Sequence, residues 1–126
     1  CDAACFAPLG EIENISLFSM QKDASPESLA HLPLAADLAP LLGDFSDTAY
    51  AAARLDLIIT VDTALAHLAG ALGRPVWLRL PHAPDWRWQR GRDDSPWYPG
   101  MRLFRQSRPG DWNDVFRRLA HALSTL

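Results

Sequence analysis

Three polar residues at short spacing, Asp62, Thr63 and His67, are the best candidates for chemistry in this sequence. A hydroxyl group and an imidazole one helical turn apart could both contact an anion, and Gly70 would allow a ligand to approach the backbone closely. The carboxylate of Asp62 would repel a phosphate placed directly on it, so we assign Asp62 to capping a helix or to holding a cation or hydroxyl group. We therefore predict a diphosphate cradle made of backbone N–H groups, Thr63 and His67.

The pattern around these residues predicts a strand, a helix and a second strand. Leu57 to Val61 is an apolar and β-branched run, too short for a helix and typical of a strand buried on both faces. From Thr63 the apolar residues follow the spacing of one helix face, and Gly73 ends this pattern before a second apolar run, Val76 to Leu80. Such a crossover builds a parallel sheet, and it places the polar residues where a strand ends and the first free N–H groups of a helix attract anions.

Two stretches resemble a known family. The first, VDTALAHLAGALGRPVW over residues 61–77, is similar to the nucleotide-sugar half of the family 9 glycosyltransferases, which include the bacterial lipopolysaccharide heptosyltransferases. The family pattern is Asp-Thr-Gly or Asp-Ser-Gly, two residues and His; Ala64 stands at the glycine position, where its methyl group would crowd a phosphate slightly. The second, PDWRWQRGRDDSPWYPGMRLFRQ over residues 84–106, resembles the family 9-like domain that follows tetratricopeptide repeats in many bacterial proteins.

The resemblance covers the chain from about Ile12 to the last helix and implies a fold. We expect an α/β protein with a Rossmann-like parallel sheet and helices on both faces, as in the C-terminal half of a two-domain GT-B glycosyltransferase. Residues 1–126 would form a single, truncated nucleotide-sugar-binding domain. The chain has no initiator methionine, so we expect it to be an excised piece preceded by an acceptor-binding half of the same protein.

The resemblance also implies a function, which is to bind the nucleoside diphosphate sugar of an inverting, metal-independent glycosyltransferase that uses no cofactor. The substrate-binding residues that it suggests are Lys22, Asp62, Thr63, Ala64, His67, Asp85 and Arg87. The general base of the family comes from the other half of the enzyme, so we assign no catalytic residue here and expect the fragment alone to be inactive. The alternative is a non-catalytic scaffolding or protein-recognition module attached to tetratricopeptide repeats. An unrelated flavodoxin-like regulatory domain is disfavoured by the second stretch.

Lys22 is the only lysine of the chain and follows a strand that we predict over Ile12 to Met20. That strand should neighbour the two strands of the central unit, which would bring Lys22 to the same sheet edge as Asp62. A lysine in this place is also an ordinary solvated loop charge. Only the resemblance favours a contact with the diphosphate.

The segment from Pro81 to Gly100 is the least regular part of the chain and contains three of its five tryptophans: Trp86, Trp88 and Trp97. Long loops without regular structure are often binding loops. The tryptophan rings could hold a sugar ring or a base, or Trp88 and Trp97 could instead plug the edge of the sheet. Six of the eleven arginines lie between Arg79 and Arg105, and we expect most of them to be solvated or paired with neighbouring acids.

Other parts of the chain give weaker signals. Ala24 to Leu42 contains three prolines and should be mostly loop, and Thr48 to Arg54 should be a short helix capped by Asp47 or Thr48. Phe45 is expected in the core. We also predict a last strand over Met101 to Gln106 and an amphipathic closing helix over Trp112 to Ser124.

Composition excludes several classes of protein. A hydrophobic content of 48% and a net charge of -3 fit one globular domain and argue against a nucleic-acid surface. The two cysteines, Cys1 and Cys5, have no matching pair at metal-ligand spacing, so we expect buried free thiols and no metal site. The sequence lacks GxGxxG and Walker motifs, a signal peptide and any apolar run approaching the ~20 residues of a membrane span, which favours a cytoplasmic protein.

Overall fold

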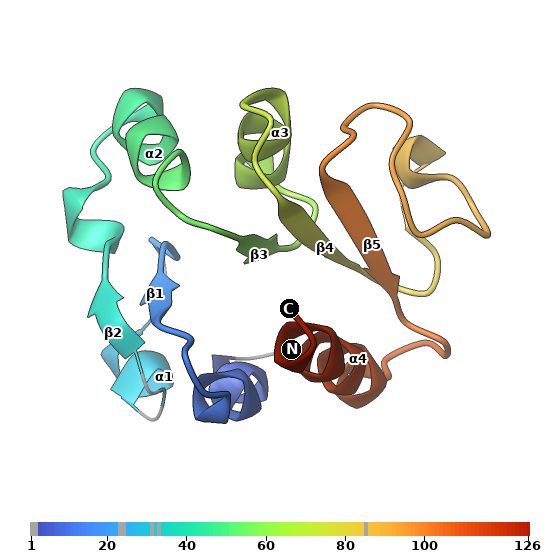
Figure 1. The fold of residues 1–126 in the computed structure, drawn as a ribbon, viewed down its shortest axis with the longest axis horizontal. Helices are drawn as coiled ribbons and strands as arrows, with labels where there is room; N and C mark the ends of the chain where they lie inside the picture. Colours follow the sequence, from blue (N-terminus) through green and yellow to red (C-terminus); the bar gives the residue numbers. More distant parts are fainter. Residues whose placement is uncertain (1–2, 23–24, 31, 33, 85) are drawn as a thin grey trace. The chain divides into compact units, whose positions relative to one another are not determined.

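The computed structural model describes residues 3–22, 25–30, 32, 34–84 and 86–126. Over these residues the chain is an α/β protein with parallel strands in two sheets, which is consistent with a Rossmann-like fold and confirms the expected fold class. The chain divides into two compact units, one made of Cys1–Gly43 with Trp112–Leu126 and the other of Asp44–Asp111. Figure 1 labels the strands and α-helices of both units.

The first unit contains a two-stranded parallel sheet. β1 (Leu17–Ser19) pairs with β2 (Leu34–Asp37), and α1 (Pro26–Ala30) lies between them in the sequence. Two expectations are wrong here. The strand predicted over Ile12 to Met20 is shorter, and it pairs with β2 in a sheet separate from the central strands. β2 itself was expected as loop, because Leu34–Asp37 contains no β-branched residue, and its pairing with β1 overrides that weak preference.

Helical segments complete the first unit. The 3-10 helix η1 (Ala3–Glu11) packs against α4 (Trp112–Ser124), where the rings of Phe6 and Phe116 meet edge-on with their centroids 4.9 Å apart. α4 has the predicted bounds, and its buried side is the predicted apolar face. Cys5 is disulfide-bonded, so the expectation of a free thiol at this position is wrong.

The second unit carries a three-stranded parallel sheet in the order β3 (Ile58–Thr60), β4 (Val76–Leu80), β5 (Met101–Arg105). The pairing aligns Ile58 with Val76 and Val76 with Met101. All five residues of β4 are buried, because this apolar strand has a neighbour on each side. The predicted parallel arrangement of the two central strands is confirmed.

α2 (Phe45–Ala52) and α3 (Ala64–Ala71) lie on the same side of this sheet (Figure 1). Asp44 caps α2 by accepting a hydrogen bond from the backbone N–H of Asp47 at 2.9 Å. The expected caps, Asp47 or Thr48, are therefore wrong. Phe45 is exposed, so its expected place in the core is wrong. The helix therefore starts three residues earlier than the sequence suggested.

Gly73 ends α3 as predicted. Its φ is 71°, a left-handed conformation that glycine adopts without steric cost, and its N–H group bonds to the carbonyl of Gly70 at 3.0 Å. The next N–H group, of Arg74, bonds to the carbonyl of Ala69 at 3.0 Å. Together these bonds form a Schellman motif and turn the chain into β4.

The core of the second unit joins the sheet, the two helices and the loop before β5. Ala66 and Ala69 are fully buried, and their small side chains allow α3 to pack closely on the strands. The other buried members of this core are Ala52, Ile58, Val76, Leu78, Leu80, Trp88, Met101 and Leu103. Among the described residues, no helix combines the length and the apolar character needed to cross a membrane.

Candidate functional site

The junction between β3 and α3 presents Thr63 at the surface. Thr63 is the N-cap residue of α3, with an extended backbone (φ -140°, ψ 174°), but its hydroxyl group makes no capping hydrogen bond. It instead contacts the carbonyl of Val61 at 3.3 Å and the hydroxyl group of Thr60 at 3.4 Å. The start of this helix therefore carries no side-chain cap, an arrangement that suits an anion.

Asp62 does not cap the helix, so this part of its expected role is wrong. Its carboxylate oxygen Oδ1 lies 3.4 Å from Nε2 of His67. The N-cap position belongs to the following residue, Thr63. Ala64 is the first residue of α3 and is exposed, so its expected crowding of a phosphate stays a prediction.

His67 lies one turn into α3 and is half-buried. While Nε2 faces Asp62, the other ring nitrogen, Nδ1, lies 3.0 Å from the hydroxyl group of Tyr98. One face of the imidazole stacks on Trp88, with ring centroids 5.5 Å apart and an interplanar angle of 24°. Both nitrogens therefore have partners within the protein.

Gly70 has a different role from the one we expected. A Cβ atom at this position would lie 2.7 Å from Cγ of Tyr98, which is closer than real side-chain contacts allow. The glycine therefore admits the aromatic ring of Tyr98, and not a ligand, to the surface of α3. This contact explains how a residue from the loop before β5 reaches His67.

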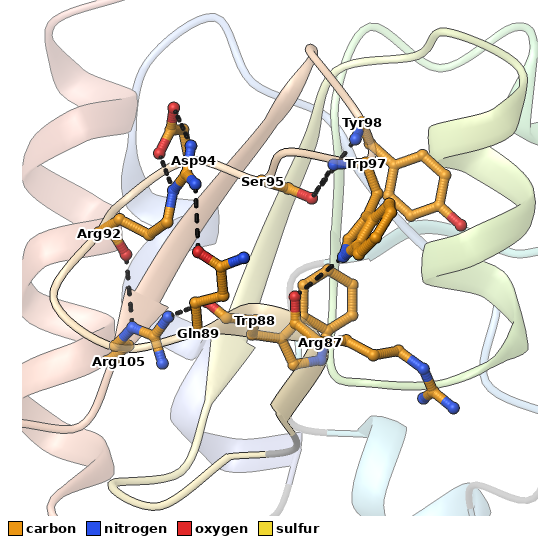
Figure 2. A network of polar contacts seen from close by, with 9 residues as sticks. All are labelled: Arg87, Trp88, Gln89, Arg92, Asp94, Ser95, Trp97, Tyr98 and Arg105. Carbon is orange, nitrogen blue, oxygen red and sulfur yellow. Dashed lines mark hydrogen bonds and ion pairs between the residues drawn. The ribbon is translucent and has the colours of Figure 1, made fainter.

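The loop that carries Tyr98 is held by a network of polar contacts (Figure 2). The guanidinium group of Arg105, on β5, donates to the backbone carbonyls of Trp88 and, at 3.4 Å, of Arg92. The guanidinium group of Arg92 in turn makes a bidentate contact with the carboxylate of Asp94, with N–O distances of 2.7 and 3.0 Å. These bonds tie the loop to the edge strand of the sheet.

The last part of the loop is closed by Ser95 and Trp97. The hydroxyl oxygen of Ser95 accepts hydrogen bonds from the backbone N–H groups of Trp97 at 3.1 Å and Tyr98 at 3.3 Å. The indole N–H of Trp97 donates to the carbonyl of Arg87 at 3.1 Å. Figure 2 shows the ring of Tyr98 directed toward α3 and the guanidinium group of Arg87 extending away from the network.

A pocket of about 280 Å³ lies between this loop and α3. It is mostly apolar, and its walls are His67, Trp86, Arg87, Trp97 and Tyr98. The two tryptophans are 75% and 57% exposed, which is unusual for large aromatic side chains without a ligand or partner. The guanidinium of Arg87 lies 5.9 Å from the ring centre of Trp86. Aromatic faces beside one cationic group could hold a ring that carries or adjoins an anion.

The sequence left open whether Trp88 and Trp97 plug the sheet edge or face a ligand, and the structure places them differently. Trp88 is completely buried and belongs to the core, as the plug interpretation expects. Trp97 is exposed and lines the pocket, so it does not plug the sheet, and its contact with a sugar ring or base stays a prediction. The sequence alone could not distinguish the two, because both lie in the same irregular loop.

Arg92 is paired with Asp94 and Arg90 and Arg102 are exposed, as expected, whereas Arg79 is buried and Arg105 bonds to backbone carbonyls. Hydrogen bonding to Arg92 lowers the pKa of Asp94. Burial lowers the pKa of Arg105 and lowers the pKa of Arg79, on β4, to about 10. Arg87 is the arginine that lines the pocket among the described residues.

The structure brings together most, but not all, of the predicted site. Asp62, Thr63, Ala64 and His67 lie at one strand-helix junction, and Arg87 shares the pocket with His67. Lys22 follows β1 in the first unit, so its expected contact with the diphosphate stays a prediction. Asp85 lies outside the described residues. In the described part of the chain, no three His, Cys, Asp or Glu residues gather in a way that could hold a metal ion.

Sequence reasoning did not select Tyr98 as a site residue and could not separate the roles of Trp88 and Trp97. Tyr98 is 31 residues from His67, so no local spacing relates the two. The only sequence signal was the concentration of aromatic residues in one irregular loop.

The parallel β3–α3–β4 crossover, with polar residues where β3 ends, defines an α/β domain of the kind that binds ligands at the carboxyl ends of its strands. The family model "Glycosyltransferase family 9 (heptosyltransferase)" matches residues 6–77, more than half of the chain, so the chain belongs to this family. The match includes Asp62, Thr63 and His67 and ends before the loop between β4 and β5, residues 81–100, which we call the pocket loop.

Protein FlbA of Caulobacter vibrioides is similar to this chain. The two are 37% identical over 83 residues, which cover 66% of this chain and 14% of FlbA. The match therefore spans only a small part of that relative's length. No solved structure matches the chain.

Proposed function

We propose that this chain binds the nucleoside diphosphate sugar of a glycosyltransferase, as part of the C-terminal half of a two-domain enzyme. The observation that carries this proposal is the uncapped start of α3, which presents backbone N–H groups and Thr63 one turn away from a pocket lined by His67 and Arg87. Family membership supports sugar transfer as the chemistry of the whole protein. The activity, the donor and the acceptor of that whole protein are part of the proposal.

The start of α3 suits the diphosphate of such a donor, and the pocket suits one of its rings. Departure of the nucleoside diphosphate builds negative charge on the β-phosphate, and the helix start offers preorganised N–H donors and a favourable dipole for that charge. A pocket of about 280 Å³ is too small for a complete nucleotide sugar but suits a single ring, with aromatic walls for stacking. We assign the diphosphate to the start of α3 and one ring of the donor to the pocket.

The remaining features of the proposal rest on the family resemblance. The transfer would invert the anomeric centre and use cationic and N–H donors in place of a metal ion. The general base would come from an acceptor-binding half of the same protein, and both units of this chain would act as one nucleotide-sugar-binding domain. Tetratricopeptide repeats in the parent protein and a cytoplasmic location belong to the same proposal.

A non-catalytic recognition module is the second candidate. Two observations favour it: the exposed methyl group of Ala64 at the helix start, and the engagement of both nitrogens of His67 within the protein. Such a module would keep the fold of the family and bind no nucleotide.

Ligand-detected NMR with UDP, ADP, GDP and CMP compounds distinguishes the two candidates. We expect at least one nucleoside diphosphate to bind, and Arg87→Ala to weaken its binding by about tenfold because a charged hydrogen-bond donor is lost. Arg90→Ala is the matched control, since Arg90 is an exposed arginine in the same loop and is absent from the pocket walls. Absence of binding by every nucleotide would favour the recognition module, and equal losses in both variants would remove Arg87 from the site.

A further inference from the structure

We propose that Tyr98 is a positioning residue that holds the imidazole of His67 at the wall of the donor pocket. This inference rests on the proposed function, and it assigns a role to a residue that the sequence pattern did not select. Its basis is the convergence of Asp62, Trp88 and Tyr98 on one histidine ring, each from a different direction.

The contacts leave His67 little freedom. The hydroxyl group of Tyr98 lies 3.0 Å from Nδ1, and the two rings meet edge-on with centroids 5.8 Å apart and an angle of 62°. Trp88, which is fully buried, covers one face of the imidazole. A ring with partners on both nitrogens and on one face is oriented before any ligand arrives, which reduces the entropy that binding would otherwise cost.

Tyr98 is itself held firmly enough to act in this way. Its ring occupies the space that the absent side chain of Gly70 leaves on α3. Its backbone N–H group donates to Ser95 at 3.3 Å, and its carbonyl accepts from Met101 at 3.1 Å, at the first residue of β5. The residue therefore connects the sheet edge, the loop and the helix through three separate contacts.

The chemistry of the three polar groups sets the tautomer of His67. An ionised carboxylate can only accept, so the nitrogen that faces Asp62, Nε2, carries the proton. Nδ1 then accepts the hydrogen bond from the hydroxyl group of Tyr98. A donor phosphate could take the Nε2–H group from Asp62, while Tyr98 keeps the ring in place.

The test compares Tyr98→Phe with Tyr50→Phe. The first variant removes the hydroxyl group and keeps the ring that packs on Gly70, so the fold should be retained. The second removes the hydroxyl group of an exposed tyrosine on α2 and serves as the control. The chain has four histidines, and His67→Ala identifies the signals of His67 in ¹⁵N spectra of the imidazole nitrogens.

We expect Tyr98→Phe to shift the Nδ1 signal of His67 away from its hydrogen-bonded position and to weaken nucleoside diphosphate binding by about twofold to tenfold, the usual range for one hydrogen bond. Tyr50→Phe should change neither measurement. Unchanged imidazole signals in Tyr98→Phe, or shifted signals with unchanged affinity, would overturn the inference. If the unaltered protein binds no nucleotide, the proposed function fails, and the imidazole signals still decide whether Tyr98 positions His67.

Discussion

His67 joins the two parts of the proposed donor site, because it lies on α3 one turn from Thr63 and also lines the aromatic pocket. Its position was predictable from local spacing, since residues three or four apart share one helix face. Its partners were only partly predictable. Asp62 is close in sequence, whereas Tyr98 reaches the ring through a tertiary contact over 31 residues.

His67→Ala should weaken nucleoside diphosphate binding more than nucleoside binding. The imidazole is assigned to the phosphate, and a hydrogen bond to a charged group contributes roughly 1.5 to 3 kcal/mol. Calorimetric titration of both ligands measures the difference. His121→Ala, which removes an exposed histidine on α4, is the control. Equal losses for the two ligands would show that His67 acts only in packing.

Gly70→Ala should destabilise the protein by about 1 to 3 kcal/mol, since the new methyl group would force the ring of Tyr98 to move. In a Tyr98→Ala background the same change should be neutral or slightly stabilising, because alanine is the better helix former once the ring is gone. Urea denaturation of the unaltered protein, the two single variants and the double variant gives the coupling free energy between the two positions. Additive effects would mean that the steric conflict at Gly70 lies with another group.

At the scale of elements, the β3–α3–β4 unit was predictable and the β1–β2 sheet was not. The first has a clear change of period, from a continuous apolar run to a helix face and back, and Gly73 marks the end of α3. The second depends on Leu34–Asp37, whose residues have little preference for a strand and take that form through pairing. Local pattern therefore predicted the β3–α3–β4 unit correctly and misplaced the first strand.

The structure of the pocket loop was also only partly predictable from the sequence. Its aromatic and arginine content was visible in the sequence, but three of the hydrogen bonds that organise it connect residues 10 to 17 positions apart. Trp88 is buried in this loop and Trp97 is exposed. No periodic pattern encodes that difference.

Arg105→Ala should loosen this loop. The substitution leaves the carbonyls of Trp88 and Arg92 without a charged donor, which we expect to cost about 1 to 3 kcal/mol. Hydrogen exchange measured by mass spectrometry should show faster exchange over residues 86–98. Arg108→Ala, an exposed arginine after the same strand, should leave this exchange unchanged. A loop that exchanges equally in the two variants would show that Arg105 does not hold it.

At the scale of the whole molecule, family 9 membership links both compact units. The family match over residues 6–77 begins in η1 of the first unit and ends in β4 of the second. Sugar transfer by the complete protein would need a general base beyond the groups assigned here, so we predict donor binding without turnover for this chain alone. A coupled assay for released nucleoside diphosphate measures that turnover.

The most direct test is a calorimetric titration of this chain with a nucleoside, its monophosphate and its diphosphate, using the base selected by NMR. We predict that affinity rises with each phosphate and that the diphosphate binds at least about tenfold more tightly than the nucleoside, because we assign the phosphates to the uncapped start of α3. Equal affinity for all three ligands, or no binding by any of them, would contradict the proposed donor site.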